Sequence, residues 1–355
     1  MFLMVAGGHF GGEGKGNIVS SLVSNFNVSA VIKTGGPNSG HTYYDSLSQC
    51  MRRLRSLSAG SSEFQGNIIF PAGSLIDPQS LLAEIKETNT KAKIIIDSRA
   101  GILTREHVYA QENDRKRYGQ IGCTFSGTGA ASADRCWRRL KLAATVPALK
   151  SYCVDNTQEI ILNIHEQDGL LVIEGAQAYG LSNYFGEYPY VTSRDSSVPG
   201  IWSQLGLSTK YLGVTALVLK SFPTRNTSES NSPYLFGENI LSSLNTNTIC
   251  EYGGGNIFGG DRRRRVGMFD WDYLDKVVKY MCPETLVVTG LDYLQSLLIS
   301  PTIRKHYGNS VHEFISHIEG RYNIPVGIRS FGPQVQNVNI TREFIKMIGE
   351  RYARL

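Results

Sequence analysis

A glycine-rich stretch near the N-terminus combines the residue types that bind phosphate. It reads Gly7-Gly8-His9-Phe10-Gly11-Gly12-Glu13-Gly14-Lys15-Gly16-Asn17. Such a stretch between a strand and a helix offers backbone N–H groups and a helix N-terminus to an anion, and Lys15 adds positive charge. It departs from the Walker A pattern, because five residues separate Gly8 from Gly14 and Lys15 is followed by a glycine. The stretch predicts a variant phosphate-binding loop.

A second motif places a histidine beside another glycine-rich turn. It reads Thr34-Gly35-Gly36-Pro37-Asn38-Ser39-Gly40-His41-Thr42. Glycines let the backbone approach a ligand closely, and a histidine there can donate a proton or a hydrogen bond to a transferring phosphoryl oxygen. A lone histidine is more often structural. The position of His41 after a second expected strand, beside the first loop, favours the catalytic interpretation.

Three further motifs carry polar or cationic side chains beside glycines. One spans 121–129 and is followed by the arginines of 135–139. Another is Glu174-Gly175-Ala176-Gln177, followed by 188–193, and the third spans 253–267 with four consecutive arginines. Guanidinium groups bind phosphates and carboxylates through paired hydrogen bonds, so the arginine-rich loop favours an anionic ligand. Taken singly, these motifs are also compatible with a surface turn, a solvated helix face or a basic surface tag.

The elements that must position these motifs alternate along the chain. Continuous apolar, β-branched runs predict buried strands, and helical patterns lie between them. The expected strands are 1–6, 30–32, 92–97, 170–174, 212–220 and 286–289, and the expected helices are 18–23, 78–87 and 271–281. This rhythm predicts an α/β fold whose open, mostly parallel central sheet is flanked by helices and binds ligands beyond the carboxyl ends of its strands. The polar segments 56–62 and 226–233 are expected to be surface loops.

Composition narrows the function classes. The chain has 355 residues, 41% of them hydrophobic and 19% charged, with a net charge of +5. It can bury a sizeable core, and its charge is too mild to indicate a nucleic-acid binder. Six cysteines without a CxxC pair argue against a zinc site or a disulfide framework. No run reaches the roughly 20 apolar residues of a membrane span, and the first apolar run is too short for a signal peptide. We expect a soluble, cytoplasmic protein.

In this order, the motifs resemble those of the adenylosuccinate synthetases. That family carries a GDEGKGK-like loop, a GGxNAGHT-like loop, an EGAQ motif, a YPYVTSS-like segment and a GRRRRxGWxD-like loop. The corresponding segments of this chain are Gly11–Asn17, Gly35–Thr42, Glu174–Gln177, Tyr188–Ser193 and Arg262–Asp270. The resemblance spans most of the chain. It implies the P-loop-like fold of that family, as a single domain over 1–355.

The resemblance also implies a two-step ligation. A nucleoside triphosphate phosphorylates O6 of a 6-oxopurine nucleotide, and the amine of L-aspartate then displaces that phosphate. Lys15 would hold the donor phosphates, His41 would stabilise the phosphoryl transfer, and Gln177 would polarise O6. Mg²⁺ would bridge the donor phosphates and touch the Gly40 carbonyl. Arg138 would reach the phosphate of the acceptor from the other subunit, which implies a homodimer.

The other site assignments carry over residue by residue. The acceptor nucleotide would be bound by Gly12, Asn38, Thr124, Arg138, Gln177, Thr192 and Asn226. The donor triphosphate would be bound by Gly11, Glu13, Gly14, Lys15, Gly16, Asn17, Gly40, His41, Thr42, Arg264, Asp292, Ser330 and Gly332. Aspartate would be bound by Gly259, Gly260, Asp261, Arg262 and Arg264.

Four departures from the family pattern concern the substrates. Gly12 stands where the ordinary enzymes carry an aspartate that takes the N1 proton of IMP. Gly290 replaces a lysine that helps to read guanine in a GTP donor, which argues against GTP. Gly259-Gly260-Asp261 replaces a Thr-Thr-Gly pattern, and Ser126 replaces an arginine.

The absence of a carboxylate at Gly12 bears on the acceptor. A carboxylate beside N1 would also lie near position 2 of the purine, so its removal leaves space for the 2-amino group of guanine. The chain resembles, at that point and in its short length, a phage branch of the family. That branch joins aspartate to dGMP with ATP or dATP, which supplies a precursor of diaminopurine DNA. We therefore predict dGMP as acceptor and ATP or dATP as donor. The alternatives are an ordinary IMP-using synthetase, a synthetase that has lost activity, and a nucleotide-binding module without turnover.

Overall fold

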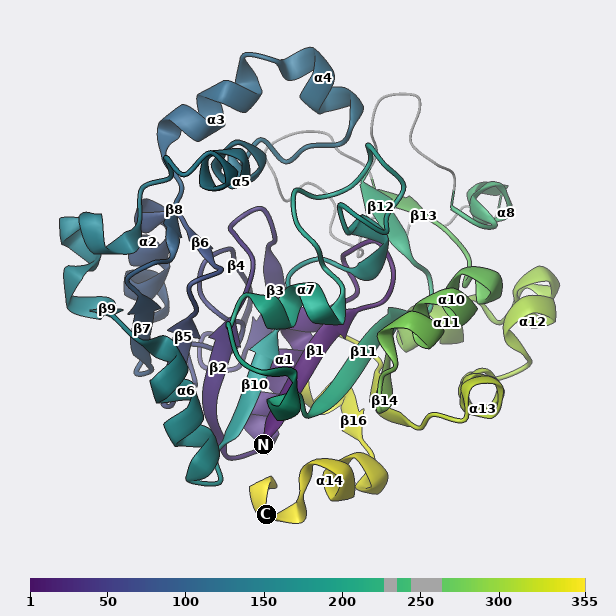
Figure 1. Cartoon of the computed structure of the whole chain (residues 1–355). Helices are drawn as coiled ribbons and strands as arrows, with labels where there is room; N and C mark the ends of the chain where they lie inside the picture. The colour runs from purple at the N-terminus through teal and green to yellow at the C-terminus, as the bar shows by residue number, and fades with distance from the viewer. Residues whose placement is uncertain (227–234, 244–263, 355) are drawn as a thin grey trace.

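A central sheet of ten strands organises the molecule (Figure 1). The computed structural model describes residues 1–226, 235–243 and 264–354. The strand order is β16-β15-β14-β11-β1-β10-β2-β5-β7-β9, and the neighbours pair in parallel except for β15 and β16. The strands are β1 (Phe2–Gly7), β2 (Val28–Lys33), β5 (Asn67–Phe70), β7 (Lys93–Asp97), β9 (Cys153–Val154), β10 (Leu170–Glu174), β11 (Val214–Lys220), β14 (Thr285–Thr289), β15 (Val326–Ser330) and β16 (Val338–Ile340).

Helices cover both faces of this sheet, because its central strands are apolar on both sides. Along β1, Phe2, Met4 and Ala6 belong to one hydrophobic core, whereas Leu3 and Val5 belong to the other. The first core includes residues of α6 (Thr157–Glu166), α7 (Val198–Ser203), α10 (Trp271–Met281), α11 (Leu291–Leu297), α12 (Pro301–Tyr307) and α13 (Val311–Tyr322). The second includes residues of α1 (Lys15–Asn25), α2 (Pro78–Thr88) and α14 (Arg342–Ile348).

Smaller elements gather near the carboxyl ends of the strands. An antiparallel hairpin joins β3 (His41–Asp45) to β4 (Cys50–Leu54), and an arm of three helices rises above the sheet at the top of Figure 1. The arm contains α3 (Arg105–Glu112), α4 (Arg115–Gln120) and α5 (Thr128–Cys136). The other short strands are β6 (Leu75–Ile76), β8 (Gly101–Ile102), β12 (Thr224–Asn226) and β13 (Arg264–Val266), and α8 spans Glu238–Ser243. The 3-10 helices are η1 (Ala143–Thr145), η2 (Pro147–Tyr152), η3 (Tyr179–Leu181), η4 (Thr209–Tyr211), η5 (Val335–Asn337) and η6 (Glu350–Tyr352).

The predicted α/β architecture is confirmed. All six expected strands are present, with boundaries that shift by up to two residues, and α10 has the predicted bounds. The β3–β4 hairpin and the strands β5, β15 and β16 were not among the expected elements. No helix in the described residues is both long and apolar enough to cross a membrane.

The prediction of a surface loop over 56–62 is wrong. The whole segment is buried, although it is rich in serine and glycine. The buried carboxylate of Glu84 accepts hydrogen bonds from the backbone N–H groups of Arg55 (2.8 Å), Ser56 (3.0 Å) and Leu57 (2.8 Å). These hydrogen bonds take the place of those that the backbone N–H groups would form with water. A polar segment can therefore be buried in the interior. Of the second expected loop, 226–233, only Asn226 lies within the described residues.

Candidate active site

A cavity of about 1380 Å³ opens at the carboxyl ends of the central strands. It is larger than a typical single-ligand pocket and is large enough for two nucleotides. Most residues predicted to bind substrates line it, and they come from seven separate segments of the sequence. These are Gly11, Gly12, Glu13, Gly14, Lys15, Gly16, Asn17, Asn38, Gly40, His41, Thr42, Thr124, Gln177, Thr192, Asp292, Ser330 and Gly332.

The first loop is held in shape by a buried ion pair. Glu13 is fully buried; its Oε1 accepts the N–H of Gly11 (2.7 Å), and its Oε2 accepts Nζ of Lys15 (2.7 Å). Burial acts to raise the pKa of Glu13, but Lys15, His9 and a backbone hydrogen bond together hold the pKa below its usual value. Thr289, at the end of β14, donates to the carbonyl of Glu13 (2.7 Å). Gly14 adopts φ +83° just before α1, a conformation that favours glycine.

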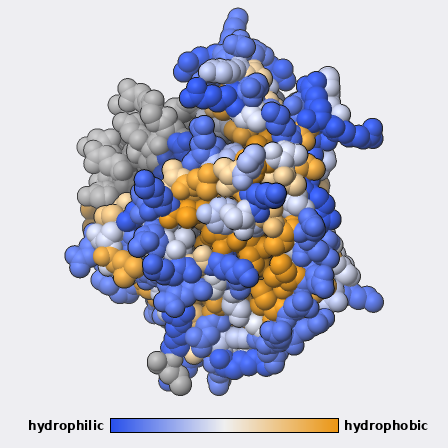
Figure 2. All heavy atoms as spheres, turned by 90° about the vertical axis from the view of Figure 1, so that its left-hand side faces the viewer, coloured by the Kyte–Doolittle hydropathy of each residue, from blue (hydrophilic) through white to orange (hydrophobic). Residues whose placement is uncertain are grey.

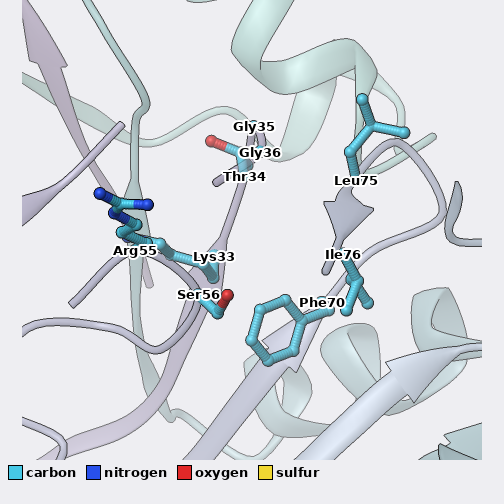
Figure 3. A pocket seen from close by; sticks show the side chains of 9 residues that line it. All are labelled: Lys33, Thr34, Gly35, Gly36, Arg55, Ser56, Phe70, Leu75 and Ile76. Atoms are coloured by element: carbon cyan, nitrogen blue, oxygen red, sulfur yellow. The ribbon is translucent and has the colours of Figure 1, made fainter. Parts of the chain in front are cut away.

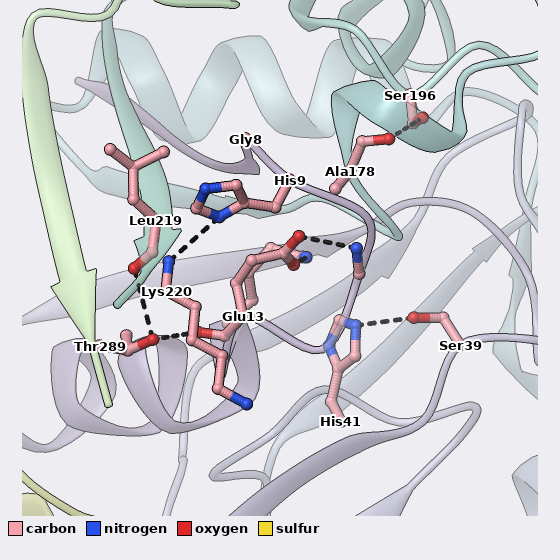
Figure 4. A network of polar contacts seen from close by, with 12 residues as sticks. Gly8, His9, Glu13, Ser39, His41, Ala178, Ser196, Leu219, Lys220 and Thr289 are labelled. Carbon is pink, nitrogen blue, oxygen red and sulfur yellow. Dashed lines mark hydrogen bonds and ion pairs between the residues drawn. The ribbon is translucent and has the colours of Figure 1, made fainter. Parts of the chain in front are cut away.

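A second buried cluster surrounds His41, whose contact with Ser39 is drawn in Figure 4. Its Nδ1 contacts the carboxylate of Glu174, the last residue of β10, and Lys33 Nζ lies 3.1 Å from the same carboxylate. Nε2 of His41 lies 3.0 Å from Oγ of Ser39, which lines the cavity. A carboxylate on one ring nitrogen fixes the orientation of an imidazole and directs its other nitrogen. The cluster therefore orients His41 for a role in the cavity.

Burial and charge set the protonation states of this cluster. Burial lowers the pKa of His41, and Lys33 adds to this effect, while Glu174 opposes it in part. Burial acts to raise the pKa of Glu174, but Lys33 and His41 together hold it well below its usual range. Glu174 is therefore a permanent anion at neutral pH, which stabilises a hydrogen bond from His41 Nδ1–H.

The polar groups predicted to bind each nucleotide come together in pairs. On the acceptor side, Asn38 Nδ2 donates to Thr192 Oγ1 (3.4 Å), and Thr124 Oγ1 lies 3.0 Å from Ser126 Oγ. On the donor side, Asn17 Nδ2 donates to the Gly332 carbonyl (3.0 Å). The contacts of Asn38 and of Asn17 each join two segments that are distant in the sequence.

Some predicted site residues are not tested by this geometry. Arg138 is exposed and does not line the cavity of its own chain. Asn226 and Arg264 are paired in the β12–β13 ribbon, but their side chains are outside the described residues. Gly259, Gly260, Asp261 and Arg262 also lie outside the described residues.

Several lining residues were not predicted. They are mainly aromatic or cationic: Phe10, Arg53, Gln111, Arg117, Lys220, Arg225 and Tyr293. Lys220 is the last residue of β11. Because ligands bind beyond the carboxyl ends of parallel strands, this position could have indicated that Lys220 lines the cavity. Arg225 is buried, pairs with Glu187 (2.6 Å) and stacks on Phe10. The glycine-rich motifs gave no signal for Arg53, which comes from the hairpin.

A second, very small cavity lies next to Lys33, the last residue of β2 (Figure 3). It measures about 10 Å³ and is lined by Lys33, Thr34, Gly35, Gly36, Arg55, Ser56, Phe70, Leu75 and Ile76. This is room for about one water molecule. Of these two cavities, only the large one has the size to hold a nucleotide.

The large cavity has few acidic side chains among its described lining residues that could bind a metal ion. Among the described lining residues, the carboxylates are those of Glu13 and Asp292, and both oxygens of Glu13 are already engaged. The described residues contain no group of three His, Cys, Asp or Glu side chains that could hold a metal ion. Mg²⁺ usually keeps several waters and takes phosphate oxygens from its substrate. A metal ion held mainly by donor phosphates fits this site.

Comparisons with known proteins agree with this geometry. The family model described as adenylosuccinate synthetase matches residues 4–146 and 139–299. The adenylosuccinate synthetase of Pyrococcus horikoshii is 32% identical over 347 residues, which cover 97% of this chain and 99% of that protein.

Two solved structures share the fold. Fully ligated adenylosuccinate synthetase from Plasmodium falciparum superposes with a TM-score of 0.81 at 22% identity, covering 96% of this chain and 99% of that one. The succinoaminodeoxyadenylate synthetase of cyanophage S-2L, bound to dGMP and to dATP as energy donor, gives a TM-score of 0.77 at 19% identity, with 99% and 98% covered. The chain thus belongs to the adenylosuccinate synthetase family, whose members are carbon–nitrogen ligases driven by a nucleoside triphosphate.

Proposed function

We propose that this enzyme joins L-aspartate to dGMP at the expense of ATP or dATP. The product would be N6-succino-2-amino-2′-deoxyadenylate, a precursor of diaminopurine DNA. The observation that carries the proposal is Gly12, which lines the cavity without a side chain while Lys15, His41 and Gln177 are all retained. Guanine differs from hypoxanthine by its 2-amino group, so a site for guanine needs space beside N1.

The surroundings of Gly12 support this proposal. Gly12 is exposed to the cavity and adopts φ +73°. The other acidic side chains among the described lining residues are Glu13, which is tied to Lys15, and Asp292, at the start of α11. Gly12 therefore leaves space at this point of the cavity for the 2-amino group of guanine.

The reaction would proceed in two balanced steps. In the first, the γ-phosphoryl group moves from the donor to O6 of the acceptor base while N1 loses its proton, and a nucleoside diphosphate leaves. In the second, the aspartate amine attacks C6, the C6–O6 bond breaks, and orthophosphate departs with O6 as the amine loses a proton. Phosphorylation of O6 is needed because oxide is a poor leaving group and phosphate is a good one.

Each retained residue has a role that suits these steps. Lys15 and the amides that begin α1 would hold the transferred phosphate, and His41 would donate from Nε2 to a phosphoryl oxygen. This donation requires a proton on both ring nitrogens, because Nδ1–H is bonded to Glu174. Burial and Lys33 lower the pKa of His41, and the anionic Glu174 together with the charge of the bound donor phosphates would offset this effect. Gln177, in a left-handed conformation at φ +63°, would bond O6. Asn38, Thr124 and Thr192 would hold the 5′-phosphate of the acceptor.

A magnesium ion is part of the proposal. The family depends on Mg²⁺, and the sparse carboxylates of the cavity suit an ion held by substrate phosphates. When bound, this ion would offset the charge of the donor phosphates, with the Gly40 carbonyl as a protein ligand.

Gly290, the residue that follows β14, supports ATP or dATP as the donor. Gly290 adopts φ +70°, and a Cβ there would lie 3.0 Å from Ser221 Oγ, so a lysine at this position would be strained. Without that lysine, position 290 offers no side-chain donor to O6 of guanine. The cyanophage enzyme of the same fold was solved with dATP as donor.

The alternative acceptor is IMP, as in ordinary adenylosuccinate synthetases. The 32% identical archaeal relative carries that name, and nearly its whole length is covered, so the shortness of this chain no longer argues for a phage enzyme. A binding module without turnover, or a synthetase that has lost activity, is disfavoured by the retention of Lys15, His41 and Gln177.

Release of phosphate separates these functions. Purified protein with aspartate, Mg²⁺ and ATP is given dGMP, GMP or IMP in turn, and we expect turnover of dGMP to be much the fastest. Faster turnover of IMP than of dGMP would overturn the proposal. Binding of dGMP without phosphate release in any mixture would identify a module without activity.

Substitution at Gly12 tests the role of that position. Asp and Asn tolerate a left-handed φ at a cost of about 1 kcal/mol, so Gly12→Asp and Gly12→Asn should fold. Both should crowd the 2-amino group and lower kcat/KM for dGMP by roughly tenfold or more, which corresponds to about 1.4 kcal/mol. Unchanged kcat/KM for dGMP in both variants would show that Gly12 does not select the acceptor, even if dGMP is the substrate.

A further inference from the structure

Arg53 lies in the large cavity although it belongs to none of the glycine-rich motifs. It comes from β4, where it pairs across the hairpin with Thr42 of β3. Because side chains alternate along a strand, Arg53 shares a face with Thr42 and Met51, and both of these also line the cavity. The opposite face carries His41, Tyr43 and Asp45, which are buried.

The guanidinium of Arg53 lies directly against Gly40. A Cβ placed on Gly40 would lie 2.6 Å from Nη2 and 2.8 Å from Cζ of Arg53 and would touch Nε as well. A real side chain at position 40 would therefore displace the guanidinium. The absence of a side chain at Gly40 is what lets Arg53 reach this part of the cavity.

Gly40 itself lies beside the phosphate-binding loop. The residues that follow it, His41 and Thr42, pack on the start of α1: a Cβ on Gly16 would lie 2.9 Å from His41 Cβ and 3.0 Å from the Thr42 carbonyl. Lys15, the first residue of α1, lines the same cavity. The hairpin thus brings a guanidinium to the edge of the site that offers backbone N–H groups and an ammonium to an anion.

We propose that Arg53 is a further binding residue for the triphosphate of the donor. It would bond the phosphate oxygens from the side of Gly40, next to the cations and amides of the first loop. The proposal rests on the nucleoside-triphosphate-driven ligase activity of the family and is independent of which purine nucleotide is the acceptor.

A guanidinium suits this position for two reasons. Its planar fork donates two parallel hydrogen bonds to phosphate oxygens, and it stays charged at every physiological pH. Lys15 already has one carboxylate partner, Glu13, so part of its charge is offset before a donor binds. A second cation in the same cavity would add attraction that Lys15 alone does not supply.

The first test compares Arg53→Met and Arg53→Lys with a neighbour in the same strand. Arg52→Met is the matched control, because Arg52 lies on the other face and pairs with Asp45 and Glu87. Assays use the acceptor that the wild-type enzyme turns over fastest. Loss of hydrogen bonds to a charged group predicts that Arg53→Met raises KM for the donor roughly ten- to a hundredfold. Arg53→Lys should recover part of the loss, and KM for acceptor and aspartate should change less than about twofold.

A binding measurement separates triphosphate recognition from turnover. Calorimetry measures the binding of a non-hydrolysable ATP analogue and of AMP. Arg53→Met should weaken binding of the triphosphate analogue and leave the affinity for AMP unchanged. Melting temperatures of the variants check that they are folded. A donor KM and triphosphate affinity equal to wild type would overturn the proposal, and so would a rise confined to KM for aspartate, since Arg53 would then bind the amino acid.

A double-mutant cycle tests the link to Gly40. Gly40→Ala should displace the guanidinium and weaken donor binding in the same direction as Arg53→Met. If both act through one contact, the double variant should be no weaker than the worse single variant. Fully additive losses would show that the Gly40–Arg53 contact does not position the guanidinium for the donor.

Discussion

His9 shows how a single buried residue makes the first loop sensitive to acid. Its Nδ1 accepts the backbone N–H of Lys220 (3.2 Å), which ties the loop to the end of β11. The ring packs against Phe269 and Tyr273. Burial lowers its pKa to about 4, with Glu13 opposing and Lys220 adding to the effect. The native fold therefore holds His9 neutral, whereas the unfolded chain protonates it below about pH 6.5.

The sign of the pH dependence follows from these two values. The contribution of His9 is complete above about pH 6.5 and is lost as the pH falls towards 4, because only the unfolded state takes up the proton. Between pH 7.5 and 5 this amounts to about 2 kcal/mol of unfolding free energy. Urea denaturation at both pH values measures it in wild type and in His9→Asn, which keeps an acceptor near the position of Nδ1.

The variant should be less stable at pH 7.5, since it loses ring packing, but it should lose less stability on acidification. The pKa of His41 is also lowered by burial, and this residue is present in both proteins, so its contribution cancels in the difference. Equal losses on acidification in the two proteins would rule out a neutral, buried His9.

At the scale of elements, Glu84 anchors the chain that leaves the β3–β4 hairpin. It lies in α2, and its carboxylate accepts the backbone N–H groups of Arg55, Ser56 and Leu57. Glu84→Gln replaces one acceptor oxygen with a donor, which leaves a buried N–H without a partner. We expect a loss of about 1–3 kcal/mol in the free energy of unfolding by urea.

Glu87→Gln, in the same helix, is the control for this substitution. Glu87 is 66% exposed and pairs with Arg52 (3.1 Å), so its loss should cost less than about 1 kcal/mol. Equal destabilisation by the two substitutions would mean that the three backbone contacts of Glu84 do not stabilise the segment.

The elements that the sequence predicted best are those with the simplest physical cause. Strands buried on both faces, such as β10 and β11, are continuous apolar runs, and the motifs at their carboxyl ends converge because parallel strands end at one edge. The hairpin that carries Arg53 has mixed polarity, since β3 alternates buried with half-buried residues and most of β4 is exposed or half-buried. The burial of 56–62 depends on Glu84, a partner about thirty residues away, which no local pattern encodes.

On the scale of the whole molecule, two observations support the expected homodimer. Figure 2 shows hydrophobic side chains gathered in the middle of the face at the left of Figure 1, with hydrophilic side chains around them. Trp137, next to Arg138, is 71% exposed. Exposed apolar areas with a polar rim are typical of interaction surfaces. Arg138 does not line the cavity of its own chain. In a homodimer it would instead contact the nucleotide bound by the other subunit.

Mixing two inactive variants tests whether Arg138 acts across the dimer. Arg138→Ala keeps an intact cavity but supplies no arginine to its partner, whereas Lys15→Ala has a disabled cavity and supplies a normal Arg138. After equal amounts are mixed and subunits exchange at random, half of the dimers contain one of each. Each mixed dimer then has one complete site, so about a quarter of the wild-type activity should return. Activity equal to the average of the separate variants, with subunit exchange verified by mass, would place Arg138 outside the neighbouring site. In that case each active site would be formed by the residues of a single chain.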